Sequence, residues 1–226
     1  MIISFEGLDL CGKSTQVEIF QKITGGYRIP QYATKQDPAA TPLERAQGYW
    51  FLEQSRLGLA EAIVNYDAIE STKKVMKDTG NFTPTGSDHD TIILDRSIDT
   101  TYAYSALFVR KGTPEQQEEY RLWMEREHEF STFPDITFFL KTTYAETRKR
   151  ATGRGFLDSE FDLMPEPLWN LVNERYMALA ERCDYRFRVI DATKTIDEVA
   201  AEIRATYVTF LQELFYNNSL ALRMQK

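Results

Sequence analysis

The residues whose types and spacing could do chemistry begin near the amino terminus, in the run Gly7, Leu8, Asp9, Leu10, Cys11, Gly12, Lys13, Ser14 and Thr15. This run has the G-x-x-x-x-G-K-[ST] spacing of a phosphate-binding loop. The two glycines let successive backbone N–H groups turn toward one centre, and the helix that follows adds its positive end. Lys13 brings a positive charge to the outer phosphates, and the Ser14 hydroxyl is a ligand for a bridging Mg²⁺ ion. The pattern predicts that the chain binds a nucleoside triphosphate.

A second pair of candidates, Asp95 and Arg96, stands where the apolar run 91–95 ends. An acid at the end of a central strand can hold the hydration shell of Mg²⁺, and an arginine can grip a phosphate through two parallel hydrogen bonds. The alternative is an ordinary ion pair at a strand end. A phosphate-binding loop in the same chain favours the first interpretation.

The segment 148–154, RKRATGR, concentrates cations in a short span. Mobile arginines that close over a transferring phosphoryl group stabilise its negative charge. We therefore predict a lid around residues 148–160, with Gly153 and Gly155 as its hinge. A solvated basic turn or a non-specific anion patch is the alternative.

Asp9 stands inside the phosphate-binding loop itself. A carboxylate beside a triphosphate is electrostatically costly. We therefore expect Asp9 to face away from the triphosphate, toward a hydroxyl of a second substrate. A side chain turned to solvent is the alternative.

Strands and helices that alternate along the chain must position these residues. The sequence predicts strands at 2–5, 27–33, 91–95, 135–140 and 185–190, and helices at 13–22, 49–77, 113–130, 143–151, 166–182 and 195–216. This alternation predicts a doubly wound, mainly parallel sheet. Together with the phosphate-binding loop it predicts an α/β P-loop NTPase fold, in which a five-stranded parallel sheet is flanked by helices in three layers. Pro30 favours an edge position for the second strand. Ligands bind beyond the carboxyl ends of such strands, so we expect the loop, Asp37, Asp95 with Arg96 and the basic segment to meet there.

Several further expectations concern packing. The buried side of the first helix should consist of Val17, Ile19, Phe20 and Ile23, and that of the last helix of Val199, Ile203, Tyr207, Phe210 and Leu214. The polar segment 79–90 is expected to be a surface loop. The tail 217–226 is expected to be poorly ordered or weakly packed. No second domain is expected within residues 1–226.

Composition narrows the class of protein. The 226 residues carry a formal net charge of −7, from 34 acidic and 27 basic side chains, which argues against a nucleic-acid partner. The two cysteines, Cys11 and Cys183, have no metal-binding spacing and predict a reducing compartment. No apolar run approaches the roughly 20 residues that span a membrane. A soluble, cytoplasmic enzyme without a membrane partner is expected.

Five segments together resemble the thymidylate kinase family of P-loop nucleoside monophosphate kinases. They are FEGLDLCGKST, TKQDPAATPLE, LDRSIDTTYAY, RATGRGFLDSE, and RYMALAE followed by FRVIDATKTIDEVAAEI. Each is similar to a motif of that family, and the five occur in the same order over most of the chain. The resemblance implies that the enzyme transfers the γ-phosphoryl group of ATP to dTMP with Mg²⁺, giving dTDP. It also suggests a homodimer.

The resemblance implies a role for individual residues. Lys13, Asp95, Arg96, Arg150 and Arg154 would be catalytic, with Ser14 and Asp95 placing Mg²⁺ and the loop from Gly7 to Thr15 holding ATP. The acceptor dTMP would be bound by Asp9, Asp37, Leu52, Arg56, Arg96, Thr100, Thr101 and Tyr104. Among these, Asp9 would accept a hydrogen bond from the 3′-hydroxyl and Arg96 would bind the monophosphate. Arg56 would read the pyrimidine O4, Thr100 and Thr101 would meet the base edge, and Tyr104 would pack against the sugar.

Some positions depart from the family pattern. Leu10 and Cys11 occupy the loop where some members carry a catalytic arginine, so the lid must supply that charge. Leu52 stands where the family has a phenylalanine that stacks on thymine. Gln36 replaces an arginine, so that Lys35 or Arg45 would have to make the corresponding phosphate contact. These departures leave open which base the enzyme prefers, including a deoxynucleoside monophosphate kinase of altered base specificity.

Two other functions remain open. The triplet Asp95-Arg96-Ser97 is close to the ERS motif of deoxynucleoside kinases, in which case Asp37 could deprotonate a sugar hydroxyl. Asp9 and the VIDA segment favour the monophosphate kinase. A non-catalytic nucleotide-binding protein is the other alternative, against which the lid arginines and the lack of an NKxD motif count.

Overall fold

A computed structural model of the chain describes residues 1–30, 91–109, 113–115, 133–154 and 160–224. The predicted helix at 49–77 and the predicted loop at 79–90 lie outside these residues, as does most of the predicted helix at 113–130. Within the described part, none of the helices is both long and apolar enough to cross a membrane.

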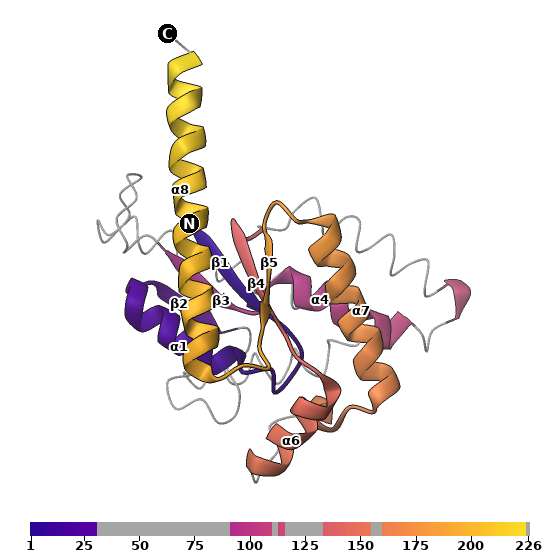
Figure 1. Cartoon of the computed structure of the whole chain (residues 1–226). Coiled ribbons are helices and arrows are strands. Elements are labelled where there is room, and N and C mark those ends of the chain that lie inside the picture. Colours follow the sequence, from indigo (N-terminus) through magenta and orange to yellow (C-terminus); the bar gives the residue numbers. More distant parts are fainter. Residues whose placement is uncertain (31–90, 110–112, 116–132, 155–159, 225–226) are drawn as a thin grey trace, which may run out of the picture.

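Five parallel strands form one sheet at the centre of the molecule (Figure 1). They are β1 (Ile2–Glu6), β2 (Tyr27–Pro30), β3 (Ile92–Asp95), β4 (Ile136–Lys141) and β5 (Phe187–Asp191). Their order is β2-β3-β1-β4-β5, which puts β2 at an edge, as Pro30 predicts. In the register, Phe5 of β1 pairs with Asp95 of β3 and Phe138 of β4. The predicted five-stranded parallel sheet is confirmed.

Helices cover both faces of the sheet, so that the fold has the predicted three layers (Figure 1). The helices are α1 (Lys13–Thr24), α4 (Ile98–Val109), α6 (Tyr144–Arg154), α7 (Glu166–Arg182) and α8 (Ile196–Met224), with a 3₁₀ turn η3 at Glu160–Leu163. Helices α1 and α8 pack on one face, and α4 packs with α7 on the other. Helix α6 lies at the end of the sheet that follows β4 and contacts η3 and α7 (Figure 1).

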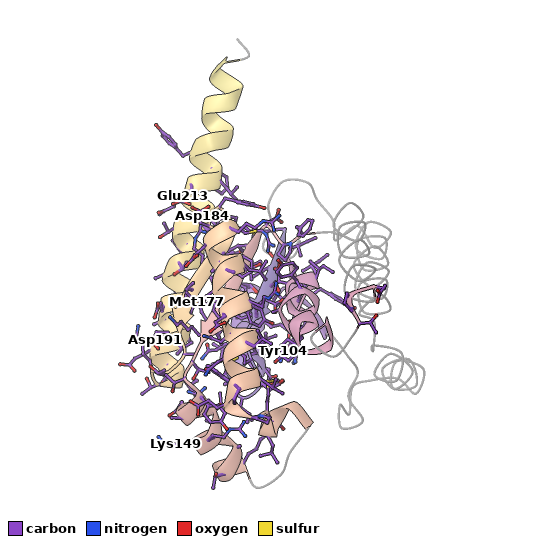
Figure 2. The ribbon with its side chains drawn as sticks, turned by 90° about the vertical axis from the view of Figure 1, so that its right-hand side faces the viewer. Tyr104, Lys149, Met177, Asp184, Asp191 and Glu213 are labelled. Atoms are coloured by element: carbon purple, nitrogen blue, oxygen red, sulfur yellow. The ribbon has the colours of Figure 1, made fainter. Side chains whose placement is uncertain are left out.

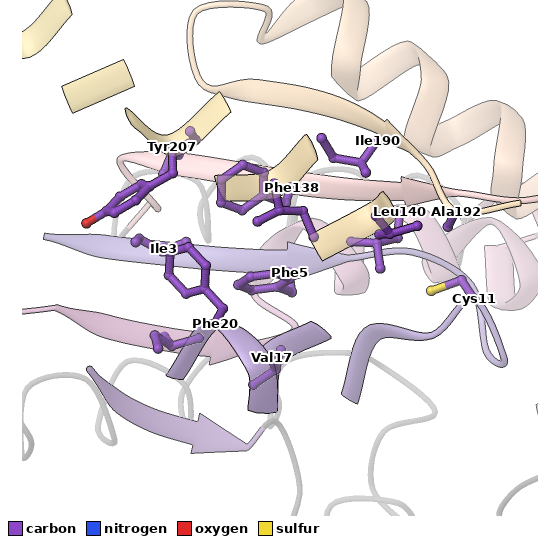
Figure 3. Packing of buried hydrophobic residues seen from close by; sticks show 14 of the residues in the cluster. Ile3, Phe5, Cys11, Val17, Phe20, Phe138, Leu140, Ile190, Ala192 and Tyr207 are labelled. Atoms are coloured by element: carbon purple, nitrogen blue, oxygen red, sulfur yellow. The ribbon is translucent and has the colours of Figure 1, made fainter. Parts of the chain in front are cut away.

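The face under α1 and α8 holds an aromatic core (Figure 3). Phe5 of β1 lies 5.4 Å from Phe20 of α1 and 5.3 Å from Phe138 of β4, measured between ring centroids. Phe20 also meets Tyr207 of α8 edge to face. Because side chains alternate along a strand, Ser4 and Glu6 of β1 face the opposite layer. This core fixes β1, and with it the loop that leaves its carboxyl end.

Two residues expected in this core are exposed instead. Ile23 is 54% exposed because α1 turns Val17, Phe20 and Thr24 inward, and Ile23 lies about 120° around the helix from Val17. Leu214 is 38% exposed because α8 is longer than the sheet it covers. Its 29 residues correspond to about 43 Å of helix, whereas a six-residue strand spans about 20 Å.

The tail 217–226, expected to be poorly ordered or weakly packed, is helical up to Met224, so that the last helix extends beyond its predicted end at 216. Helix α8 continues to Met224 and projects beyond the rest of the molecule (Figure 1). Residues 217–224 contain no glycine or proline and include Leu, Ala, Arg and Met, all good helix formers. At its other end, α8 begins with a capping box, in which Thr195 N donates to Glu198 Oε2 at 3.0 Å and Glu198 N donates to Thr195 Oγ1 at 3.4 Å.

Candidate active site

The phosphate-binding loop connects β1 to α1, as predicted. Gly7 and Gly12 both have positive φ, 143° and 97°, which side chains other than glycine rarely adopt. A Cβ atom at Gly7 would lie 2.8 Å from the backbone oxygen of Leu140, so the neighbouring strand leaves no room for one. The buried Lys13 ammonium donates to the carbonyl oxygen of Gly7 at 3.1 Å. Ser14 is exposed in the first turn of α1, where its hydroxyl is accessible.

Three polar side chains form a cluster beside this loop, here called the Asp9 cluster: Asp9, Arg96 and Tyr104. Arg96 Nη2 donates to Asp9 Oδ1 at 2.7 Å, and the Tyr104 hydroxyl donates to Asp9 Oδ2 at 2.9 Å. The Arg96 guanidinium also lies 5.4 Å from the centre of the Tyr104 ring. Tyr104 projects from α4 (Figure 2), whereas Asp9 comes from the loop after β1 and Arg96 from the end of β3. The fold therefore brings three predicted acceptor residues together.

The charges in the Asp9 cluster hold one another in their charged forms. Burial acts to raise the pKa of Asp9, but the positive charges of Arg96 and Lys13 outweigh it and keep that pKa below its ordinary value. Burial and the neighbouring Asp9 carboxylate raise the pKa of Tyr104, so its phenol stays a hydrogen-bond donor. Burial acts to lower the pKa of Arg96, but the neighbouring Asp9, Tyr104, Tyr176 and Glu6 together raise it by more. At neutral pH the cluster thus holds a carboxylate, a guanidinium and a neutral phenol.

Arg96 has an unusual backbone conformation, with φ of 81°. Non-glycine residues held there are strained, and such strain is concentrated at functional sites. The amide of Arg96 donates to Phe5 O at 3.1 Å, which continues the pairing of β3 with β1 up to this residue. The strained turn sends the side chain back over the phosphate-binding loop, where Nη1 donates to Gly7 O at 3.0 Å.

Asp95 lies at the carboxyl end of β3, as predicted, but its carboxylate is engaged by a residue that sequence reasoning missed. Arg28 Nη2 of the edge strand β2 donates to Asp95 Oδ2 at 2.8 Å. The pair is mostly buried, with 27% and 13% of the two side chains exposed. The register explains the contact: Arg28 is paired with Ile93, two residues before Asp95, and residues two apart on a strand point to the same face of the sheet.

The basic segment divides into residues with different surroundings. Arg150 reaches the phosphate-binding loop: its Nη1 donates to Leu10 O at 3.2 Å and its Nη2 to Ala192 O at 2.7 Å. Glu146, one turn earlier, accepts from Arg150 Nε at 3.1 Å and orients the guanidinium. Arg148 instead donates to Asp162 O of η3 and lies over the Tyr144 ring. Lys149 is 80% exposed at the far end of the molecule from Glu213 (Figure 2).

The remaining predicted residues are placed only in part. Arg154 is the last residue of α6 and is exposed. Residues 155–159 of the predicted lid lie outside the described part. Thr100 is buried, with its hydroxyl bonded to Arg96 and to Glu6. Asp37, Leu52 and Arg56, and the side chain of Thr101, also lie outside the described residues, so their roles stay predictions.

Sequence reasoning also missed Glu6, a fully buried carboxylate below Arg96. An acid in the otherwise apolar and neutral strand IISFE was the available signal, because buried charges need partners. Burial, followed by the neighbouring Asp99, raises the pKa of Glu6. Asp99 in turn forms a buried bidentate ion pair with Arg186, at 2.6 and 2.7 Å.

A glycine-rich loop with its lysine, at the carboxyl edge of a parallel sheet covered by helices on both faces, defines a P-loop nucleotide-binding protein. The family model for thymidylate kinase matches residues 5–203. The chain belongs to the thymidylate kinase family.

Individual proteins agree with this membership. A thymidylate kinase of Burkholderia vietnamiensis is 26% identical over 208 residues, which cover 89% of this chain and 94% of that protein. Among solved structures, the thymidylate kinase of Candida albicans superposes with a TM-score of 0.63 at 20% identity, covering 92% of this chain and 91% of that one. The deoxyadenosine kinase of M. mycoides with bound dATP gives a TM-score of 0.60 at 19% identity, covering 92% and 99%. These structures share the P-loop kinase fold with this chain.

Proposed function

We propose that the protein is a thymidylate kinase that transfers the γ-phosphoryl group of ATP to dTMP, giving ADP and dTDP. The observation that carries this proposal is the Asp9 cluster, in which an arginine and a carboxylate lie side by side at the rim of the phosphate-binding loop. An arginine suits the phosphate of a nucleoside monophosphate, and a carboxylate suits a sugar hydroxyl. A phosphate-binding loop alone would account for ATP but not for this second set of groups.

On the ATP side, the loop amides and the amino terminus of α1 would cradle the phosphates. Lys13 would then exchange the Gly7 carbonyl for phosphate oxygens. Arg150 stands across the loop, with Nη1 only 3.6 Å from where a Cβ of Gly12 would be. From there its guanidinium can stabilise the charge that spreads over the transferring group. Arg150, rather than the more distal Arg154, is our candidate for the lid cation that replaces a loop arginine.

The residues proposed to place Mg²⁺ fit that ion. Magnesium is usually bound through one or two carboxylates together with phosphates and water, rather than by a cage of protein ligands. The exposed Ser14 hydroxyl and the Oδ1 atom of Asp95, whose Oδ2 atom is bound by Arg28, would supply oxygen ligands of the right kind. When bound, the ion would neutralise charge on the phosphates.

On the acceptor side, Arg96 would turn Nη2 from Asp9 to the dTMP phosphate and bring the attacking oxygen into line. Asp9, released from Arg96, would accept the 3′-hydroxyl, and Tyr104 would pack against the sugar. The attacking oxygen belongs to a phosphate that is already ionised, so no strong general base is required. Positioning and charge stabilisation account for the catalysis.

An acceptor screen tests this proposal. Purified protein with Mg·ATP is given dTMP, dUMP, dCMP, dGMP, dAMP or thymidine, and ADP formation is followed for each. We expect dTMP to give the highest kcat/KM. Turnover of thymidine in preference to dTMP would instead show a deoxynucleoside kinase, and ATP binding without turnover of any acceptor would show a non-catalytic protein.

Assembly and compartment complete the proposal. We infer a homodimer in the cytoplasm, in keeping with the family resemblance and with two cysteines that are free thiols in the structure. Light scattering on a sizing column measures the mass directly. A mass near 52 kDa, twice that of the 26.2 kDa chain, is expected.

A further inference from the structure

A buried layer of polar side chains lies between the sheet and helices α4 and α7. Its centre is the Glu6 carboxylate, which is 0% exposed. One oxygen, Oε1, accepts from Ser97 N at 2.6 Å, from Ser97 Oγ at 2.8 Å and from Ser4 Oγ at 3.1 Å. The other oxygen, Oε2, accepts from the Tyr176 hydroxyl at 3.0 Å and from Thr100 Oγ1. Five donors therefore converge on the two oxygens of this carboxylate, and these hydrogen bonds favour its charged form, whereas burial and Asp99 raise its pKa.

This carboxylate is joined to Arg96 through Thr100. Arg96 Nη1 donates to Thr100 Oγ1 at 3.3 Å, and the same hydroxyl donates to Glu6. The Thr100 hydroxyl thus links the Glu6 carboxyl group to the guanidinium in one hydrogen-bonded chain. Glu6 also binds the backbone N–H of Ser97, the residue that follows Arg96 and its strained backbone. Both the side chain and the backbone of Arg96 therefore depend on Glu6.

The two edges of the guanidinium have different partners. Nη1 points inward, to Gly7 O and Thr100. Nη2 points outward, to Asp9, whose side chain is 26% exposed. A phosphate can replace the outer partner while the inner ones stay in place. The inner contacts therefore determine which way Arg96 presents Nη2.

We propose that Glu6 is a positioning residue that orients Arg96 toward the phosphate of the acceptor nucleotide. This inference rests on the proposed function, because it assumes that Arg96 binds the acceptor. Glu6 itself would contact neither substrate, but it supports Arg96, which would contact the acceptor. Removing its charge should weaken acceptor binding and leave ATP binding unchanged.

The other half of the polar layer offers a matched control. Thr137 of β4 is equally buried, and its hydrogen-bond partners are Arg186, which donates to it at 2.9 Å, and Asp99, which accepts from it at 3.4 Å. Replacing Thr137 by valine leaves a buried arginine donor without this partner and so costs stability. It should not change acceptor affinity. A general loosening of the core would affect both variants alike.

The experiment compares wild type, Glu6→Gln and Thr137→Val by calorimetric titration with dTMP and, separately, with the ATP analogue AMPPNP, and by steady-state kinetics. For Glu6→Gln we expect the Kd and KM for dTMP to rise about tenfold, the effect of losing one hydrogen bond to a charged group. The AMPPNP Kd should stay within about twofold, and Thr137→Val should match wild type in both affinities. Equal weakening in the two variants, or an unchanged dTMP affinity in Glu6→Gln, overturns the inference.

If Glu6→Gln does not fold, a second variant tests whether Glu6 positions Arg96. Tyr176→Phe removes only one hydroxyl from Glu6 Oε2 and keeps the ring stacked on Phe139 at 4.9 Å. We expect a smaller rise in dTMP Kd, of about threefold, because four of the five donors to Glu6 remain. An unchanged Kd contradicts the role of Glu6. Failure of the proposed function is distinguishable, because wild type would then leave dTMP unphosphorylated. If wild type phosphorylates another acceptor of the screen instead, the variants are compared on that acceptor. If wild type phosphorylates none of them, both the proposed function and the role of Glu6 are refuted.

Discussion

Replacing Arg96 by lysine separates the charge of this side chain from its geometry. The guanidinium spans two directions at once, inward to Gly7 O at 3.0 Å and Thr100 Oγ1 at 3.3 Å, and outward to Asp9 at 2.7 Å. An ammonium has a single nitrogen and cannot hold the inner partners while it grips a phosphate on the outer side. The variant keeps the positive charge but loses this two-sided grip.

The size of the effect follows from the bonds lost. Two hydrogen bonds to charged groups at about 1.5 kcal/mol each give about 3 kcal/mol, or a fall of roughly 100-fold in kcat/KM for dTMP. The KM for ATP should change by no more than about twofold, because the contacts of Lys13 and Arg150 are untouched. The assay is steady-state ADP formation with dTMP and ATP varied in turn.

A matched control uses Arg188, which is 26% exposed and lies 3.8 Å from Glu213 of α8, away from the phosphate-binding loop. Arg188→Lys should have wild-type kinetics. If Arg96→Lys also stays within about threefold of wild type, then Arg96 supplies only charge, and the geometric reasoning about its two edges is refuted.

Three further predictions follow from individual contacts. Arg150→Ala should lower kcat by about tenfold or more with little change in dTMP KM, measured by the same assay, because it removes a cation from the transferring group rather than from the acceptor. Arg186→Met should lower the free energy of unfolding in urea by about 3 kcal/mol, since it leaves Asp99 buried and unpaired, whereas Arg188→Met should cost less than about 1 kcal/mol. Asp9 has a lowered pKa in the folded protein, so the stability it contributes is present above its unfolded pKa of about 3.9 and is lost as pH falls through the lower folded value. Urea unfolding from pH 6 downward should therefore show a smaller loss of stability in Asp9→Asn than in wild type, and a parallel loss in both would contradict the pairing with Arg96.

The sheet could be predicted from the sequence because each strand is a short apolar run in a regular alternation with helices. The phosphate-binding loop could also be predicted, since its glycines and lysine have a spacing that few other structures require. The predicted bounds of α7, 166–182, coincide with those observed. Pro30 was enough to put β2 at an edge.

Features that depend on tertiary contacts could not be predicted in the same way. Ile23 and Leu214 are apolar, and only the direction of α1 and the length of α8 relative to the sheet show that they are exposed. The end of α8 was misread because a polar pair of asparagines was taken as the start of a loose tail. The residues that follow the two asparagines favour a helix, and α8 continues through them to Met224.

The residues of the candidate site that face the acceptor were predicted more completely than the residues that hold them in place. Asp9, Arg96 and Tyr104 come together as the motifs implied, since all three lie at the carboxyl edge of the sheet. Glu6 and Arg28 were missed because their partners are far away in sequence: Tyr176 is 170 residues from Glu6, and Asp95 is 67 from Arg28. Contacts at such separations depend on strand order, which a single sequence does not specify.

The central claim, that a P-loop site and the Asp9 cluster together transfer a phosphoryl group to dTMP, is tested most directly by following the products. Wild-type protein is mixed with Mg²⁺, dTMP and ATP labelled in its γ-phosphate, and the nucleotides are separated by chromatography. We predict that the label appears in dTDP, with one ADP formed for each dTDP. Label released as inorganic phosphate, or transferred to thymidine while dTMP is left unchanged, would contradict the account.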